Sequence, residues 1–162
     1  MIIAIDFDGT CVTHEFPEMG KDIGAVPVLK LLIEQGHELI LWTMRSDNPK
    51  RKHLTEAVKW FKDNDIPLYG INQNPKQGVW TSSPKAYAQL YIDDAALGCP
   101  LISDANHSKR RYVDWYQLVD YLLEWEIIIP PEEVGLSGLV EHLKEKWDGI
   151  ETMKTLFTEE ER

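Results

Sequence analysis

The sequence predicts an α/β fold in which a parallel sheet of about five strands is doubly wound, with helices on both faces. Short apolar runs typical of buried strands alternate along the chain with amphipathic segments of helical periodicity. Strands and helices in alternation imply a parallel, Rossmann-like sheet whose strands are joined by crossover helices. The chain has 162 residues, of which 43% are hydrophobic and 27% charged, which suits a single globular domain.

Five apolar segments are the predicted strands, and each is short and bounded by polar or turn-forming residues. They are residues 2–5, 38–42, 66–71, 90–92 and 100–102. The loop at 11–21 and the loop at 72–84 are rich in polar residues, proline and glycine, so we expect irregular structure there.

Two helices are predicted between the first three strands. In the first, apolar residues recur at helical spacing from Val26 to Ile33, and Gly36 follows as a C-terminal stop. The second is expected to begin at Asn48-Pro49, with asparagine as N-cap and proline at the first helical position.

Two further helical segments are predicted later in the chain. A short helical turn is expected at residues 85–88. A final helix is expected to start at Asp114, which forms a capping box with Gln117.

The charge of the chain limits its partners. The formal net charge is −10, which disfavours a nucleic acid polymer as partner because phosphate contacts need a basic surface. A local basic patch at residues 50–53 is the exception that leaves such a partner open. No apolar run approaches the roughly 20 residues that span a bilayer, and no signal peptide precedes the first strand. We therefore expect a cytoplasmic protein that does not bind membranes.

Acidic and hydroxyl side chains follow three of the predicted strands. Asp6 and Asp8 follow the first strand and precede a turn at Gly9, Thr43 follows the second, and Asp93-Asp94 follows the fourth. Ligands of open parallel sheets bind outside the carboxyl ends of the strands, so these side chains are expected at one edge.

This set of groups suggests phosphate chemistry. Four neighbouring carboxyl groups repel one another unless a cation lies between them or some are protonated. Oxygen ligands alone favour a hard ion such as Mg2+. One carboxylate can then attack phosphorus and form an acyl phosphate, and a second can protonate the leaving group. Thr43 and Lys85 are available to hold the remaining phosphate oxygens.

Four segments, in this order, resemble the four motifs of the haloacid dehalogenase-like phosphohydrolases. The resemblance covers roughly residues 1–102 and not the last sixty residues. The segments are Asp6-Phe7-Asp8-Gly9-Thr10, Leu41-Trp42-Thr43, Lys85 and Ile92-Asp93-Asp94.

The resemblance implies roles for the catalytic and phosphate-binding residues. Asp6 would be the nucleophile that becomes phosphorylated, and Asp8 the general acid and base. Thr43, Lys85 and Gly9 would bind the phosphoryl group, and Lys85 would also be catalytic, keeping Asp6 ionised and neutralising the transferring group.

The resemblance also implies a Mg2+ site. Its expected ligands are Asp6, the main-chain carbonyl of Asp8, and Asp93, with Asp94 acting through water or directly. An aspartate at the position of Asp8 is typical of the phosphatases and phosphomutases of the family.

A cap domain has no room in this chain. Residues 9–42 are filled by one loop, one helix and one strand, and only residues 72–84 are free before Lys85. The chain resembles capless members of the family, which often act on large substrates or use a neighbouring subunit as a lid.

The sequence says less about the identity of the substrate than about the reaction. Thr43 and Arg45 form a Thr-x-Arg arrangement similar to that of some nucleotide and polynucleotide 3′-phosphatases, which favours a nucleotide-like or 3′-phosphorylated substrate. Arg45 either contacts substrate or forms a structural ion pair. His14 either touches the leaving group or lies in a plain surface loop.

The main alternatives are a phosphotransferase and a non-catalytic binding or assembly module on the same fold. A receiver domain is excluded by the order of the acidic pair and the lysine. Residues 1–126 are expected to form the catalytic core. Residues 127–162 are expected to be a helical extension that packs on the core or forms a homo-oligomer contact.

Overall fold

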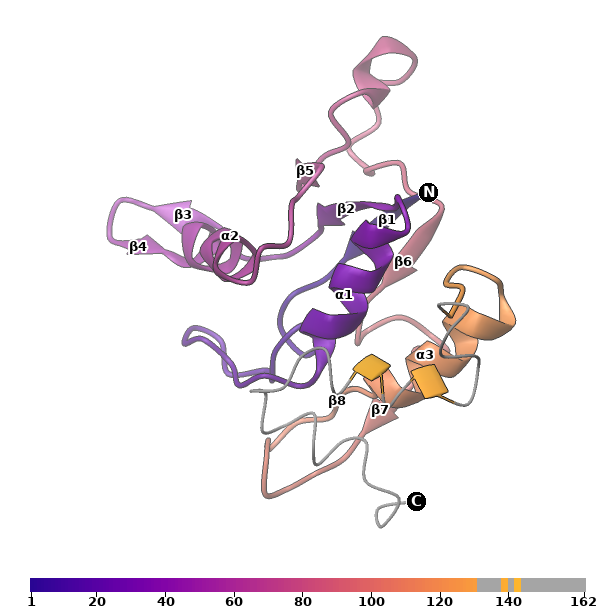
Figure 1. The fold of residues 1–162 in the computed structure, drawn as a ribbon. Helices are drawn as coiled ribbons and strands as arrows, with labels where there is room; N and C mark the ends of the chain where they lie inside the picture. Colours follow the sequence, from indigo (N-terminus) through magenta and orange to yellow (C-terminus); the bar gives the residue numbers. More distant parts are fainter. Residues whose placement is uncertain (131–137, 140–141, 144–162) are drawn as a thin grey trace.

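The computed structural model describes residues 1–130, 138–139 and 142–143, and it is an α/β structure built on a four-stranded parallel sheet (Figure 1). The strands of this sheet lie in the order β5-β2-β1-β6, and every pair is parallel. They are β1 (Ile2–Ile5), β2 (Glu38–Leu41), β5 (Gly70–Ile71) and β6 (Leu90–Ile92).

The pairing register aligns the carboxyl ends of three strands. Ile5, the last residue of β1, lies opposite Leu41 in β2 and Ile92 in β6. The N–H of Asp6 donates to the carbonyl of Ile92 at 2.9 Å, which extends this pairing by one residue. The segments that follow β1, β2 and β6 therefore leave the sheet side by side, as the sequence predicts.

The predicted fifth strand does not join the parallel sheet. β7 (Leu101–Ile102) pairs antiparallel with β8 (Tyr112–Val113) in a separate two-stranded ribbon. Only residues 93–100 connect β6 to β7, and a parallel neighbour needs a crossover of a dozen or more residues. The N–H of Val113 donates to the carbonyl of Gly9 at 2.8 Å, so the ribbon lies against the turn after β1.

The helices α1 (Ala25–Glu34), α2 (His53–Asp63) and α3 (Trp115–Glu124) contribute to one core cluster. That cluster also contains the alternate sheet positions Ile3, Ile5, Leu39 and Leu41. Successive side chains of a strand point to opposite faces, so the buried Ala4 and Ile40 face the other way. Among the described residues the helices share this one cluster, and helices on both faces of the sheet are not confirmed.

The predicted start of α2 at residues 48–49 is wrong. A small antiparallel hairpin precedes the helix, made of β3 (Asp47–Asn48) and β4 (Arg51–Lys52). The Asn48 carboxamide oxygen accepts the N–H groups of Lys50 and Arg51, at 2.9 and 3.0 Å. Asparagine and proline here form the hairpin turn, which is the other structure that this residue pair favours.

The helix is capped instead by a residue six positions before it begins. Asp47 Oδ1 accepts the N–H groups of Leu54 and Thr55, at 2.9 and 3.1 Å, and Asp47 Oδ2 accepts the hydroxyl of Thr55. A carboxylate at this position also interacts favourably with the helix dipole.

The cap of α3 is confirmed in part. Asp114 Oδ1 accepts the N–H of Gln117 at 3.0 Å. The return bond of a capping box is not formed, because the N–H of Asp114 donates to the carbonyl of Pro100. The Gln117 side chain donates to the Tyr121 hydroxyl.

The loop between β5 and β6 contains a short 3-10 turn, Gln77–Val79, and the predicted helical turn at 85–88 is not present. Beyond α3, the described residues Ile127, Ile128, Leu139 and Leu143 are buried in the core cluster. The division at residue 126 stays a prediction, since most of the segment from 131 onward lies outside the described residues. In the described part of the chain, no helix is long and apolar enough to cross a membrane.

Candidate active site

The turn after β1 is tight and internally bonded. The carbonyl of Phe7 accepts the N–H groups of Cys11 and Val12, and the N–H of Gly9 donates to the carbonyl of Val12 at 2.7 Å. Phe7 itself is buried in the core, so Asp6 and Asp8 on either side of it are turned toward the sheet edge.

Gly9 allows a close approach between this turn and the end of β6. Its φ is +88°, and a Cβ built there would lie 2.4 Å from Asp94 Oδ2. Both facts exclude a side chain. The predicted phosphate contact through Gly9 has no support in its amide, because that N–H already donates to Val12.

Three carboxylates meet at this edge. Asp6, Asp93 and Asp94 each offer an oxygen, and these oxygens lie within 4.8 Å of one another. Burial raises the pKa of Asp6 to about 7, the Phe7 N–H opposes that rise, and the charges of Asp93, Asp94 and Asp8 add to it. Burial, and then the charge of Asp93, also raise the pKa of Asp94. Ionisation of all three carboxyl groups is therefore electrostatically unfavourable without a cation. The cluster also has the oxygen donors that a hard cation prefers.

Thr10 links the Asp6 carboxylate to the main chain of Asp94, a role that the sequence analysis did not assign. Its hydroxyl donates to Asp6 Oδ2 at 3.3 Å and accepts the N–H of Asp94 at 3.0 Å. The Trp115 indole N–H of α3 donates to the Thr10 carbonyl at 2.8 Å. The sequence signal for this role is the position of Thr10, a hydroxyl side chain that directly follows the Asp8-Gly9 turn.

Asp8 is held apart from this cluster by Arg45. Arg45 Nε and Nη2 donate to the two carboxylate oxygens of Asp8, each at 2.7 Å. Arg45 is only 2% exposed, and its Nη2 also donates to the carbonyl of Glu18 at 2.7 Å. The structure thus forms the ion pair that was one of the two expectations for Arg45, and the Asp8 side chain is not part of the cation-competent trio.

One nitrogen of this guanidinium has no partner among the described residues. Nη1 of Arg45 is buried without a hydrogen bond, although the other guanidinium nitrogens are satisfied. Its guanidinium carbon lies 5.1 Å from the centroid of the Phe7 ring and 5.4 Å from that of Phe16. Arg45 therefore packs against two aromatic rings and forms an ion pair with one carboxylate.

Thr43 lies at the same edge, two residues beyond β2. Its N–H donates to the Asn72 carboxamide oxygen at 2.8 Å, and its hydroxyl accepts the N–H of Arg45 at 3.2 Å. Asn72 has a positive φ of 51°, which asparagine tolerates better than most residues. The sequence analysis missed Asn72, and its signal was an asparagine directly after the third strand.

The structure does not place Lys85 beside Thr43 and the acidic residues of the cleft. Its side chain is exposed, and its ammonium lies 5.2 Å from the centroid of the Tyr91 ring. It does not line the cleft that the acidic residues share.

The cleft has a volume of about 370 Å³ and is formed by the segments after β1, β2 and β6. His14 lies in it, and its charge opposes the rise in the pKa of Asp94. Seven of the ten lining residues are charged or polar, and the other three are apolar. The lining residues are Asp6, Asp8, His14, Phe16, Thr43, Met44, Arg45, Asp93, Asp94 and Ala95.

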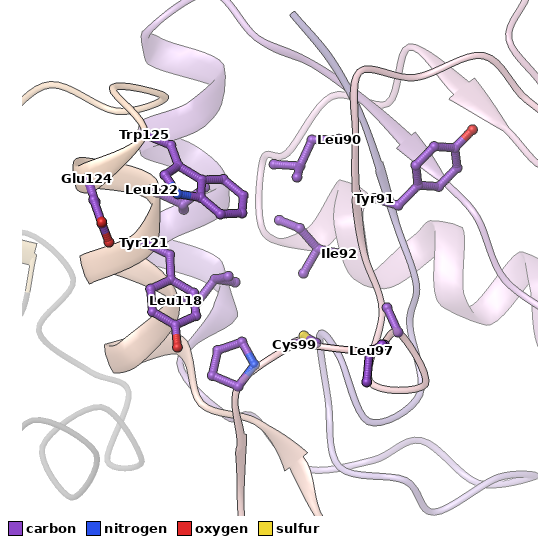
Figure 2. A pocket seen from close by; sticks show the side chains of 13 residues that line it. Leu90, Tyr91, Ile92, Leu97, Cys99, Leu118, Tyr121, Leu122, Glu124 and Trp125 are labelled. Carbon is purple, nitrogen blue, oxygen red and sulfur yellow. The ribbon is translucent and has the colours of Figure 1, made fainter.

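A second cavity, of about 340 Å³, lies between β6 and α3 and is mainly apolar (Figure 2). Leu122 of α3 and Trp125, which follows the helix, face Leu90 and Ile92 across it, whereas Tyr91 points away. Glu124 is the single carboxylate of its lining. The chemistry of paired carboxylates therefore belongs to the first cleft.

Comparison with solved structures gives one informative relative. The chain is 33% identical to a conserved protein from Bacteroides thetaiotaomicron, with a TM-score of 0.59. The match covers 78% of this chain and 91% of that one. The chain belongs to the family of that protein. Neither the family models nor the curated proteins give a match. Family membership thus agrees with the α/β architecture, and the chemistry of the cleft is argued from its residues.

Proposed function

We propose that this protein is a Mg2+-dependent phosphatase that hydrolyses a phosphate monoester through an aspartyl phosphate on Asp6. The observation that carries the proposal is the meeting of Asp6, Asp93 and Asp94 within 4.8 Å at the carboxyl edge of a parallel sheet. Asp8 and Thr43 line the same cleft. The proposal agrees with the resemblance to the haloacid dehalogenase-like phosphohydrolases, of the capless type.

The residues present suit a divalent cation. Asp6, Asp93 and Asp94 offer oxygen donors only. Burial, and to a lesser extent the charge of neighbouring carboxylates, raises the pKa of Asp6 and of Asp94, and a bound cation would offset this cost of ionising them. Together with the main-chain carbonyl of Asp8, they would hold Mg2+. Such an ion supplies charge neutralisation and orientation of the phosphate in the cleft.

The reaction assigned to these residues has two steps. In the first, an Asp6 oxygen attacks phosphorus, the bond to the ester oxygen breaks, and protonated Asp8 gives that oxygen its proton. In the second, ionised Asp8 takes a proton from water, and that water attacks the phosphorus of phospho-Asp6. Inorganic phosphate leaves, and Asp6 is restored.

The ion pair suits the second step, whereas for the first step one Asp8 oxygen has to release its Arg45 hydrogen bond in order to carry the proton. Both oxygens of Asp8 accept hydrogen bonds from Arg45, which is the arrangement of an ionised carboxylate. Arg45 is thus proposed to position Asp8. Its own contact with substrate is restricted by its burial.

The phosphoryl oxygens need further donors. The Thr43 hydroxyl lies in the cleft and is proposed as one of them. Lys85 is proposed as the positively charged side chain that binds the phosphoryl group, because of its position in the order of the four motifs. To reach the cleft its ammonium has to leave the Tyr91 ring.

The substrate class is proposed as a phosphorylated small molecule or a nucleotide-like compound. A cleft of about 370 Å³ without a cap domain has room for a small monoester or the end of a larger one. Residues 50–52 are basic and exposed in the hairpin, and the next residue, His53, contacts the ring of Phe16 in the cleft lining, so they would favour an anionic substrate.

The test is hydrolysis of p-nitrophenyl phosphate and of a panel of nucleotides and 3′-phosphorylated oligonucleotides. We expect activity with Mg2+, none with EDTA, and a loss of at least about a thousand-fold in Asp6→Asn. Asp63→Asn, an exposed change on α2, is the matched control and should leave the rate unchanged. Full activity of Asp6→Asn would refute the mechanism. Transfer of phosphate to an added alcohol would show a phosphotransferase, and Mg2+ binding without turnover of any substrate would favour a binding module.

A further inference from the structure

We propose that Phe16 and Met44 form a ring-binding subsite of the acidic cleft, in which they contact a planar aromatic or heteroaromatic group of the substrate next to its phosphate. This inference rests on the proposed function and narrows its substrate class to ring-bearing phosphate esters.

Two large, exposed apolar side chains line the cleft that contains the acidic cluster. Phe16 is 52% exposed and Met44 is 96% exposed. They come from different segments, the loop after β1 and the residue after Thr43, yet both line the cleft that contains Asp6. Apolar surface that faces a ligand cleft is buried when an apolar part of the ligand covers it.

The Phe16 ring is held in place. Its centroid lies 5.4 Å from the guanidinium carbon of Arg45 and 5.2 Å from the centroid of the His53 ring, which meets it edge to face. Arg45 is in turn fixed by its two hydrogen bonds to Asp8. The Phe16 ring and the Asp8 carboxylate are therefore both positioned by the buried side chain of Arg45. A fixed aromatic side chain loses little conformational entropy when a ligand stacks on it.

The chemistry of the two side chains favours a ring over an alkyl chain. Aromatic pairs gain from offset or edge-to-face geometry beyond the burial of area. The methionine thioether is polarisable and makes favourable contacts with ring edges. Met44 is unbranched and exposed, so it can adapt to rings of different size.

Binding of non-hydrolysable phosphonates tests the subsite without turnover. Phenylphosphonate and methylphosphonate carry the same anionic head, and calorimetry with Mg2+ gives the affinity of each. We expect wild-type protein to bind phenylphosphonate about ten-fold more tightly, and Phe16→Ala to lose most of this preference while methylphosphonate affinity is unchanged. Phe16→Trp should keep the preference, and Met44→Ala should reduce it about two- to three-fold.

Val79→Ala is the matched control, because Val79 is 90% exposed and does not line the cleft. It should behave as wild type. Equal wild-type affinity for the two phosphonates, no binding of either, or an equal loss of both in Phe16→Ala would overturn the subsite. A ring preference that depends on Phe16, in a protein that hydrolyses no phosphate ester, would instead refute the proposed reaction and leave the subsite standing. Kinetics on phenyl phosphate and nucleoside 3′- and 5′-monophosphates then distinguish a simple aryl group from a nucleobase.

Discussion

Gly9 shows how a single backbone position controls the geometry of the acidic cluster. Its positive φ lets the chain turn after Asp8, and its missing side chain leaves room for the Asp94 carboxylate. The sequence points to the turn, because Asp-Gly favours one. It does not point to the contact with Asp94, which joins residues 85 positions apart and depends on how β1 and β6 pair.

Gly9→Ala is expected to be much more damaging than Gly36→Ala. Both glycines have positive φ, +88° and +80°, so the backbone strain of an alanine is similar, at about 1–2 kcal/mol. A Cβ at Gly36 meets nothing within 4 Å, whereas one at Gly9 meets Asp94. Urea unfolding should show the larger loss of stability for Gly9→Ala, and phosphatase assays the larger loss of rate. Equal effects in the two variants would mean that the contact with Asp94 does not matter.

Lys85 is the predicted site residue whose role most needs a test. If the Lys85 ammonium binds the transferring phosphoryl group, Lys85→Ala should lower kcat at least about 100-fold, because a positive charge oriented toward that group is removed. Lys76→Ala is a close control, since the Lys76 ammonium also lies over a tyrosine ring, 5.7 Å from the centroid of Tyr69. Steady-state kinetics in the two variants gives the comparison. Wild-type kcat in Lys85→Ala would remove this residue from the mechanism.

At the scale of elements, strand ends were easier to predict than helix starts. Asp6 and Asp93 directly follow apolar runs, Asp8 and Asp94 come one or two residues later, and parallel pairing then places all four at one edge. The start of α2 was wrong because Asn48-Pro49 suits a helix cap and a hairpin turn equally well in sequence. The residue that caps the helix, Asp47, lies outside the spacing that sequence patterns for caps describe.

Asp47→Ala is expected to lower the denaturant midpoint of unfolding, because the N–H groups of Leu54 and Thr55 lose their acceptor. Thr55→Val, which removes only the hydroxyl bond to the same carboxylate, should cost less. Chemical denaturation measures both. A change at Asp47 no larger than that at Thr55 would show that the backbone cap contributes little.

The sheet itself was predicted in outline and not in strand number. Parallel strands and their alternation with helices follow from periodicity, and the structure confirms a parallel sheet. The fifth segment, which is apolar but short, could not be placed from sequence because its partner is the equally short β8. The pairing of Asp8 with Arg45 was one of two expectations, and the choice depends on burial that local sequence does not encode.

At the scale of the whole molecule, the acidic cluster should link stability to pH and to Mg2+. The pKa of Asp6 rises from 3.8 to about 7 on folding, mainly because of burial. Below pH 3.8 the group is protonated in both states and has no effect. From there to about pH 7 the unfolded chain loses the proton while the folded chain keeps it, so the free energy of unfolding falls as pH rises.

Mg2+ should therefore raise the melting temperature more at pH 8 than at pH 5, because it binds the ionised cluster. At a concentration 100 times its Kd, the expected stabilisation at pH 8 is about 2.7 kcal/mol. Asp6→Asn should raise the Tm of the metal-free protein at pH 8 and abolish the Mg2+ effect, whereas Asp63→Asn should do neither. Asp22, whose pKa burial also raises, is unchanged in both variants and does not affect the comparison. Thermal scans in which Mg2+ stabilises Asp6→Asn as much as wild type would contradict this link.

The central claim is that Asp6 becomes phosphorylated, and the most direct measurement is to trap the acyl phosphate. In Asp8→Asn the second step is slowed, whereas p-nitrophenolate is a weakly basic leaving group that needs no proton from residue 8. The phosphoenzyme should therefore accumulate after mixing with p-nitrophenyl phosphate and Mg2+. Borohydride reduction converts an aspartyl phosphate to homoserine, which peptide mass spectrometry locates. We predict homoserine at residue 6 and at no other aspartate. Turnover of substrate by wild type, with no reduced residue at position 6 in Asp8→Asn, would contradict the mechanism.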